Sequence, residues 1–481
     1  NVFADDSMLE MGHLNPHGRF VHLYLNGVYW GVFHLRERWG AGTHHRYLGG
    51  SSADYESING NQNIGGWAEG APYDGDGRTW ARVRTLRGNY AAVKQWVDIP
   101  DYIDFMILWM YGRCEDEFRC VGPTVPGSGF QFYLNDADGF FQSPSHPWYG
   151  EPANRTARQT PGRRAGDGPG SLFSTLLAQG DPDFRTLLAD RIYKACFNDG
   201  TLTFGNVSNR LKGRSDELEK VFVAEAARWD YRTLDNWRSV RDDVFEHWLP
   251  TRTENVFASM RSAGLYPNLE APTMNQQGGQ VTNGFQVRFG SARRGSVLYT
   301  LNGDDPRLPG GRVAPSARRV ARGTATQDDT GIPIDGKAVV KSRTWDGNQW
   351  SALNTAFFQT GASGLQEGEV TIANFNFDSS MKEEAEFVEV SNVSSRAVNL
   401  RGARFTEGID YAFADNRDTL LAPGQKLLLV KDLFRFRQRR GLEIAVDGIY
   451  TRKKKQSDRF IALNLGSGEL ITKRRLDSVE P

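Results

Sequence analysis

Two groups of acidic residues in this sequence have types and spacing that suit work on a phosphate ester. Asp116 follows a stretch of helical character, and Asp136 and Asp138 follow an aromatic stretch about twenty residues later. Phosphoryl transfer needs one acid that orients or deprotonates the attacking hydroxyl and another that holds Mg²⁺ or Mn²⁺ on the phosphates. A plainer interpretation is also open, because Asn-Asp-Ala-Asp-Gly is a common turn composition and Asp116 also fits a solvated helix end.

The elements that must position these acids can be predicted from local patterns. A helix is expected over residues 98–110, before Asp116, and a strand over the aromatic residues 130–134. Residues 20–35 predict two strands around Asn26-Gly27, a dipeptide that accepts the positive φ angles of a type I′ hairpin turn. The first part of the chain therefore mixes short strands with helices.

A further helix is predicted from Asp181, which suits the N-cap, and Pro182, which suits the first helical position. Its apolar positions recur at helical spacing: Phe184, Leu187, Leu188, Ile192 and Cys196. Cys196 is therefore expected to be a core residue. For Cys114 and Cys120 a disulfide across a short loop and two free thiols both stay open.

Composition excludes some functions and bounds the number of domains. Lys plus Arg number 58 and Asp plus Glu number 58, so no net charge recruits nucleic acid or an anionic membrane. The longest apolar runs fall far short of the ~20 residues that span a bilayer. At 481 residues the chain predicts about three domains. Residues 143–170, rich in Pro, Gly and Arg without a period, predict a long loop.

Several motifs of residues 1–271 together resemble the CotH kinase family. The motif YLNGVYWGVFHLRE (24–37) looks like its hairpin signature, and VDIPDYIDFMILWMYG (97–112) is similar to the helix before its catalytic loop. FQFYLNDADGFF (130–141) resembles the strand that enters its acidic metal motif, and stretches within 181–267 resemble its helical half. The resemblance implies an atypical secreted protein kinase that uses ATP with Mg²⁺ or Mn²⁺.

The resemblance also implies roles for individual residues. Asp116 takes the place of the catalytic-loop acid, Asp136 and Asp138 take the place of the metal ligands, and Glu37 takes the place of the glutamate that pairs with a phosphate-binding lysine. The expected loop departs from the family pattern, because residues 116–121 lack the asparagine that helps to hold the metal. These departures keep an inactive pseudokinase as the alternative.

Two later segments have resemblances of their own. Residues 272–361 resemble the small β-sandwich at the end of chitobiases, with YTLNGDDPR (299–307) as its signature. There Asp304, Asp305 and Arg307 are expected to close a turn, and Trp345 and Trp350 to pack in or beside a core. Residues 366–481 resemble a lamin-tail domain, an immunoglobulin-like sandwich, on the motif EFVEVSN (386–392) and the turn APG (422–424).

The sequence therefore predicts a multidomain α+β protein. A kinase-like domain over 1–271, truncated at its N-terminus, would precede two all-β sandwiches over 272–361 and 366–481, the last truncated at its C-terminus. Both ends are expected to be cut, and the sequence given is expected to be inactive by itself because the strands that would supply a cationic phosphate clamp are missing.

Two function classes follow, and they share a location. The first is a kinase that phosphorylates Ser or Thr of extracytoplasmic proteins. The second is a pseudokinase-bearing surface protein whose sandwiches bind a cell-wall or matrix partner. A glycosidase is suggested only by the chitobiase-like segment and would need paired carboxylates. A secreted or cell-surface location is implied by resemblance alone, with no nucleic-acid partner and no membrane span.

Overall fold

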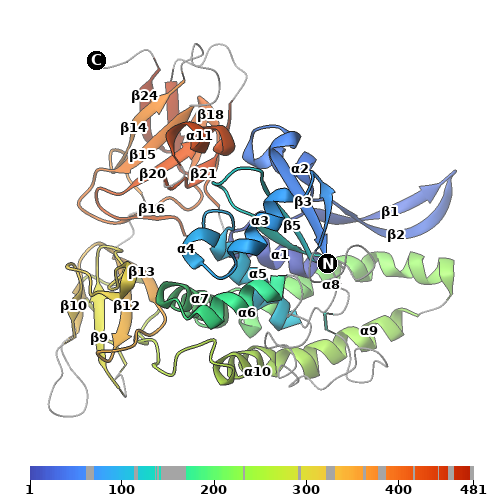
Figure 1. The fold of residues 1–481 in the computed structure, drawn as a ribbon, viewed down its shortest axis with the longest axis horizontal. Coiled ribbons are helices and arrows are strands. Elements are labelled where there is room, and N and C mark those ends of the chain that lie inside the picture. Colours follow the sequence, from blue (N-terminus) through green and yellow to red (C-terminus); the bar gives the residue numbers. More distant parts are fainter. Residues whose placement is uncertain are drawn as a thin grey trace. The chain divides into compact units, whose positions relative to one another are not determined.

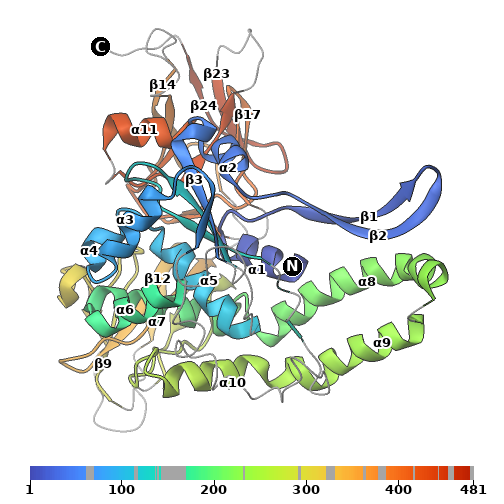
Figure 2. The same ribbon diagram turned by 45° about the vertical axis from the view of Figure 1, so that its right-hand side comes forward.

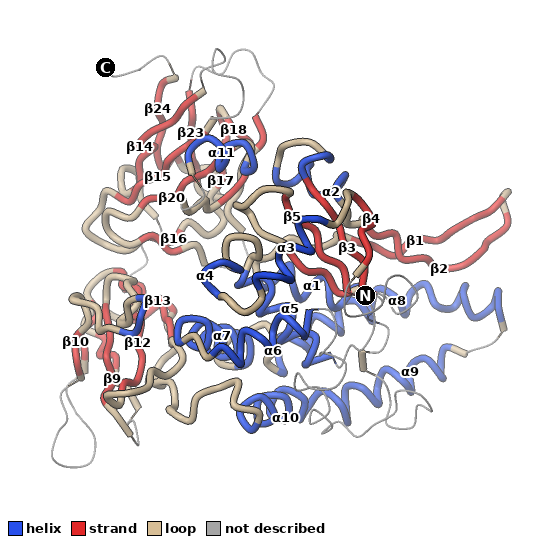
Figure 3. The backbone as a smooth tube through the Cα atoms, in the orientation of Figure 1, coloured by secondary structure: helices blue, strands red, loops and turns tan. Residues whose placement is uncertain are grey.

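The computed structural model describes most of the chain. The described residues are 1–60, 70–112, 118–135, 137, 140–141, 169–230, 233–290, 294–320, 331–360, 365–377, 386–414, 418–441, 444–452 and 460–476. They form two compact units, one of Asn1–His45 and Ser51–Asn268, and one of Arg46–Gly50 and Leu269–Pro481. Figure 3 shows that the first mixes helices with strands and that the second is nearly all strand. The chain is therefore a mixed α and β protein.

The first unit begins with a helix and a hairpin and ends with helices (Figure 1). Its elements are, in chain order, α1 (Val2–Met11), β1 (Gly18–Leu25), β2 (Val28–Arg36), α2 (Ala41–Leu48), η1 (Ser52–Asp54), β3 (Tyr55–Gly60), β4 (Ala71–Asp74), α3 (Arg78–Leu86), α4 (Tyr90–Val93), α5 (Ile99–Gly112), β5 (Phe118–Pro123), β6 (Gln131–Leu134), α6 (Pro169–Gln179), α7 (Pro182–Cys196), α8 (Phe204–Trp229), α9 (Leu234–Asp243), the π-helical turn η4 (Val244–Trp248) and α10 (Leu249–Ser262).

The predicted hairpin forms β1 and β2, which pair antiparallel from Gly18 opposite Arg36. Asn26 and Gly27 have φ angles of 51° and 80°, so the turn residues adopt the left-handed backbone that the sequence predicts. Figure 2 shows the hairpin beside α8. There Val32 N–H donates to Glu225 Oε2 at 2.8 Å, which ties the outer edge of β2 to that helix. The hairpin prediction is confirmed.

A four-stranded antiparallel sheet lies next in the first unit, in the order β4-β3-β5-β6. Residues 118–121, which the resemblance assigns to a catalytic loop, are instead the start of β5. Cys120 and Val121 are fully buried there, and Cys120 pairs with Ile58 of β3 and Phe132 of β6. Their apolar side chains and their two paired neighbours favour a central strand over a loop. The expected loop at these residues is therefore wrong.

Both predicted helices of the first unit are present. The Asp181 side chain accepts hydrogen bonds from Asp183 N and Phe184 N, with Pro182 in the first turn of α7. Cys196 is buried in this helix, and Cys120 and Cys196 both carry free thiols, which contradicts a bridge to Cys120. The core role predicted for Cys196 is confirmed. Cys114 lies outside the described residues.

In its described residues, the second unit is built from short strands and the helix α11. Its elements are β7 (Gly279–Val281), β8 (Phe285–Val287), β9 (Ser296–Thr300), η5 (Pro309–Gly311), β10 (Arg318–Arg319), β11 (Ile332–Ile334), β12 (Lys337–Trp345), β13 (Asn354–Thr360), β14 (Val370–Asn376), β15 (Phe387–Asn392), β16 (Val398–Asn399), β17 (Arg404–Glu407), β18 (Ile409–Asp410), β19 (Leu420–Leu421), β20 (Lys426–Val430), α11 (Leu433–Arg440), β21 (Gly448–Ile449), β22 (Thr451–Arg452), β23 (Phe460–Asn464) and β24 (Leu470–Arg475).

Two apolar clusters stabilise this unit. Strands in the order β10-β9-β12-β13-β7 form one sheet, and its cluster includes Val340 and Phe358. Sheets β14-β15-β20-β21 and β17-β23-β24 both send side chains into a second cluster, for example Val390 from the first sheet and Ile461 from the second. The second cluster is thus shared between two sheets, as in a layered β structure.

The turn predicted in the first of these regions is confirmed at Asp305. Arg307 N donates to Asp305 Oδ1 at 2.9 Å, and the buried Arg343 donates to both oxygens of the same carboxylate at 2.7 and 2.6 Å. Trp350 is buried and stacks on Trp345 with 4.7 Å between ring centroids. The two tryptophans therefore pack together at the sheet, as the sequence predicts. The domain boundaries at 271/272 and 361/366 stay predictions.

Candidate functional site

Glu37 follows the last residue of the hairpin and closes its base. His17 N donates to Glu37 Oε2 at 2.9 Å, and Glu37 N donates to His17 O at 3.0 Å. These reciprocal bonds join the residues on either side of β1 and β2. The geometry gives Glu37 a role in holding the hairpin, and its expected role near a nucleotide stays a prediction.

Arg36, one residue earlier, joins three segments. Its Nε and Nη2 donate to Asp5 Oδ2 and Oδ1 of α1, both at 2.7 Å. Nη2 also donates to Leu134 O at 3.2 Å, and Nη1 donates to Asn135 Oδ1 at 3.4 Å. Since Leu134 ends β6, the guanidinium lies where the chain enters the expected metal motif. Paired Arg–carboxylate bonds of this kind fix orientation as well as charge.

Two contacts hold α1 near the end of β6: a hydrogen bond of Asn1, and the bonds of Arg36 to the buried Asp5. Asn1 Oδ1 accepts a hydrogen bond from Ala137 N at 2.8 Å, and Ala137 is buried. Burial raises the pKa of the Asp5 carboxyl to about 6, while the hydrogen bonds and charge of Arg36 oppose this rise. The arrangement therefore places one cation and one weakly acidic carboxyl beside the end of β6.

The acids that the sequence singled out lie outside the described residues. These are Asp116, Asp136 and Asp138. The structure fixes what flanks them: α5 ends at Gly112, β5 begins at Phe118, and β6 ends at Leu134. The loop expected over residues 143–170 also lies outside the described residues, apart from its last two residues, which begin α6. The structure therefore leaves the convergence of the three acids a prediction.

The C-terminal end of α5, which precedes Asp116 in the chain, is capped by a buried cation. Arg252 of α10 is 2% exposed, and its Nε donates to Tyr111 O at 2.7 Å and its Nη2 to Met110 O at 3.1 Å. The guanidinium also lies over the Trp248 ring, 4.7 Å from its centroid. A cation at this end satisfies carbonyls that have no partner within the helix and complements the helix dipole.

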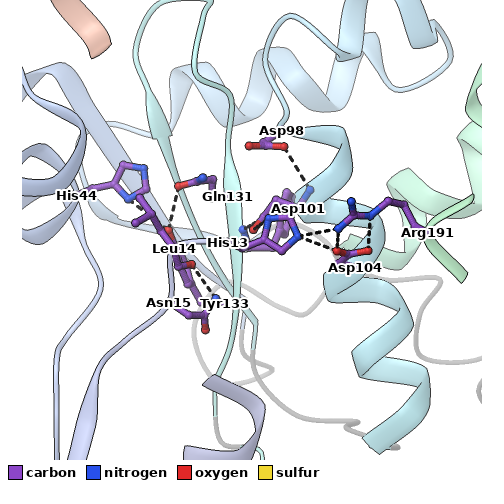
Figure 4. Close-up of polar contacts among 11 residues, drawn as sticks. His13, Leu14, Asn15, His44, Asp98, Asp101, Asp104, Gln131, Tyr133 and Arg191 are labelled. Atoms are coloured by element: carbon purple, nitrogen blue, oxygen red, sulfur yellow. Dashed lines mark hydrogen bonds and ion pairs between the residues drawn. The ribbon is translucent and has the colours of Figure 1, made fainter. Parts of the chain in front are cut away.

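A buried polar cluster surrounds the first turns of α5 (Figure 4). Asp101 Oδ2 accepts from Phe132 N of β6 at 2.7 Å, and Asp101 N donates to Asp98 Oδ1 at 3.2 Å. Asp104 Oδ1 accepts from Arg191 Nε at 2.7 Å, and Arg191 Nη2 also bonds to Asp104 Oδ2. His13, between α1 and β1, has Nε2 2.7 Å from Asp104 Oδ2 and Nδ1 3.6 Å from Asp101 Oδ1.

A second polar group lies on the other side of β6 in Figure 4. His44 Nδ1 is 3.3 Å from the Tyr133 hydroxyl, which donates to Gln131 Oε1 at 3.4 Å. Trp39 stacks on Tyr133 with 4.8 Å between ring centroids. Burial lowers the pKa of His44 to about 3, so its imidazole is neutral. This group therefore packs in the interior beside the sheet, and His44 adds no charge to it.

Neither polar cluster was predicted from the sequence, and the cap at Arg252 was not predicted either. One signal for the first was present, since Asp101 and Asp104 interrupt an otherwise apolar helix at a spacing of three residues. Acids in such a run must lie on its polar side or be buried with partners. No local signal marks Arg252, because its partners are backbone carbonyls distant in the chain.

The types of the candidate ligands indicate which metal ion they would suit. Among the residues that the structure describes, no three His, Cys, Asp or Glu side chains form a group suited to a metal ion. Asp136 and Asp138 would supply hard carboxylate oxygens, which suit Mg²⁺ or Mn²⁺, and the described Arg36 lies beside the strand that leads to them. The donor types therefore fit such an ion with ATP phosphates.

In the first unit a β-hairpin is thus tied to the strand that leads into the expected acidic motif. Residues 1–69 match the model of the CotH kinase protein family. The matched segment includes Asp5, Arg36 and Glu37, and this supports kinship with that family. No curated protein matches the chain. In the part of the chain that the structure describes, no helix has both the length and the apolar character to cross a membrane.

Proposed function

We propose that this chain is an atypical secreted protein kinase that transfers phosphate from ATP to Ser or Thr of extracytoplasmic proteins. The family match over residues 1–69 carries the proposal, together with the contact of Arg36 with Leu134 and Asn135. That contact links the matched hairpin to the strand that leads into the acidic motif. Secretion and the choice of a protein substrate rest on the family resemblance.

Each residue would contribute a defined step. Asp116 would orient and deprotonate the attacking hydroxyl, and Asp136 with Asp138 would hold Mg²⁺ or Mn²⁺. The bound metal ion would neutralise charge on the ATP phosphates. Arg36 is a described cation that donates to Leu134 O at the end of β6, and its bonds to Asp5 keep its position fixed. Glu37 would act indirectly, by keeping the hairpin base closed.

Phosphate incorporation into a serine-rich acceptor tests the proposal, with Mg²⁺ and Mn²⁺ compared. Asp116→Asn and Asp136→Asn should each lower the rate by about 10² or more, as for loss of a central acid or a charge-stabilising group. Asp76→Asn is the matched control, because this acid is exposed and pairs only at the surface with Arg78. Equal rates in all variants, or no incorporation by the full-length gene product, would contradict a kinase.

The alternative is an inactive pseudokinase-bearing surface or adhesion protein. It is favoured by β5, since residues 118–121 are paired on both sides in the sheet and replace the expected loop. In that case the strands of residues 269–481 would bind a cell-wall or matrix partner. Calorimetry with Mn²⁺ and ATP separates the two: a pseudokinase would show no transfer, and its binding signal would not depend on Asp116.

A further inference from the structure

The cluster around α5 contains more negative than positive fixed charge. Asp101 and Asp104 are 0% and 1% exposed, and the guanidinium of Arg191, a permanent cation, contacts Asp104. Arg191 bonds to both oxygens of Asp104, so that pair is neutral together. Asp101 is left with backbone donors and the His13 ring. A buried carboxylate without a compensating charge costs several kcal/mol.

Hydrogen-bond geometry shows where a balancing proton belongs. Since a carboxylate only accepts, a hydrogen on His13 Nε2 would donate to Asp104 Oδ2 at 2.7 Å, and the Arg191 guanidinium also faces this nitrogen, with Nη2 3.3 Å away. His13 Nδ1 then faces Asp101 Oδ1 at 3.6 Å. One proton on either of these two atoms makes Asp101, Asp104, His13 and Arg191 neutral together, with Asp98 beside them as a further acid: it produces either an imidazolium beside a carboxylate or a neutral ring beside a carboxylic acid.

The groups that face this pair favour retention of that proton. Burial raises the pKa of Asp101 well above its usual range, and Asp98 adds to this, while Phe132 N–H and Arg191 oppose it. From the sheet, Cys120 and Tyr133 face Asp101, and burial raises the pKa of each well above its usual range, so both are neutral. Desolvation lowers the pKa of Arg191 to about 10, which still leaves it charged near pH 7.

We propose that these residues form a proton-operated latch. The proton shared by Asp101 and His13 holds the connection between α1 and β1, residues 12–17, against α5 and α7. Loss of the proton as pH rises leaves one net negative charge on Asp101, Asp104, His13 and Arg191 together. His13 is the member that leaves, because it lies on a connecting segment whereas its partners lie in packed helices. Asp101 then keeps its hydrogen bond from Phe132 N, and Arg191 keeps its bond to Asp104.

The latch does not depend on the proposed activity. Its effect on a kinase does rest on that function: α1 carries Asp5, which holds Arg36, and the hairpin begins directly after residue 17. Release would loosen both attachments to the end of β6. An acidic environment would therefore favour the closed hairpin base and a neutral one would favour its release.

Amide hydrogen exchange between pH 5.5 and 8.5, corrected for the intrinsic pH effect, tests the latch. The reporters are the amides of Gly12, His13 and His17, which donate to Leu9 O, Met8 O and Glu37 Oε2. A single released proton changes an opening equilibrium by at most about tenfold per pH unit. Protection in the native chain should fall at least tenfold across this range.

Two variants and a control make the result decisive. Asp101→Asn copies the protonated state, so its protection should stay high at every pH. His13→Gln removes the shared site, so at pH 5.5 its protection should fall to the native level seen at pH 8.5, and this variant decides the matter where Asp101→Asn does not fold. His247→Gln, at an exposed histidine paired with Asp243, should behave as the native chain. Protection independent of pH in the native chain, or His13→Gln protected as the native chain at pH 5.5, would overturn the latch.

Discussion

Replacement of Arg252 by methionine should loosen the C-terminal end of α5 and leave the rest of the first unit folded. Methionine keeps an unbranched apolar stem as far as the position of Nε, so the stem stays packed while the guanidinium over Trp248 is removed. What it removes are the two bonds from the guanidinium to Tyr111 O and Met110 O. Both carbonyls then lie in the interior without that donor.

The expected cost follows from these contacts. Each hydrogen bond from a charged donor contributes about 1.5 to 3 kcal/mol, and the cation–π contact contributes roughly 0.5 to 2 kcal/mol. Removal of a buried cation recovers part of this sum because its desolvation penalty also disappears. A net loss of roughly 2 to 4 kcal/mol of local stability is therefore expected, which corresponds to exchange about 30- to 700-fold faster.

Native-state hydrogen exchange of the peptide 105–112 measures this loss directly. Arg261→Met is the matched control, because it changes the same helix at a side chain whose contact with Asn268 O is long, 3.4 Å, and exposed. Exchange of residues 269–481 should not change in either variant. If Arg252→Met exchanged within threefold of Arg261→Met, the cap would not stabilise the end of α5 and the reasoning from its hydrogen bonds would be wrong.

Three further outcomes follow from buried groups. Cys120 and Cys196 should resist alkylation at pH 8 in the native chain and react after unfolding, since burial raises the pKa of Cys196 to about 12; fast native labelling would contradict this. Burial raises the pKa of Asp5 from 3.8 to about 6, so the folded state binds the extra proton and stability falls as pH rises from about 4 to 6; urea unfolding of Asp5→Asn should lack that slope. Lys337→Met should cost roughly 1.5 to 3 kcal/mol and speed proteolysis near residues 361–365, because the buried Glu369 loses the Lys337 cation at 3.3 Å while it keeps Arg396; unchanged cleavage would show that the pair does not join the two groups of sheets.

Local chemistry was sufficient where a few adjacent residues decide the structure. Asn26-Gly27 predicts the hairpin turn because both residues tolerate positive φ, and both adopt it. Asp181 followed by Pro182 predicts the start of α7 because a carboxylate can accept the first free N–H groups, and it does. Asp305 likewise accepts from Arg307 N. Each of these predictions depends on contacts within three residues in the chain.

Contacts between distant segments were beyond such patterns. The loop expected at residues 118–121 is a strand because β3 and β6 lie on either side of it, and neither partner is visible in its own sequence. Asp104 and Arg191 meet across 87 residues, and Arg252 reaches carbonyls more than a hundred residues earlier. Backbone carbonyls leave no trace in residue type, so a cap of that kind cannot be predicted from composition or spacing.

Hydrogen bonds at the end of β6 connect the segment that matches the CotH kinase model with residues beyond that segment. Asn1 and Arg36 belong to the segment that matches the CotH kinase model, whereas Leu134 and Ala137, which they contact, lie well beyond it. These bonds reach backbone atoms, so they constrain the path of the chain whatever the neighbouring side chains are. These contacts therefore agree with the family match, and Asp116, Asp136 and Asp138 stay the residues predicted to decide the activity.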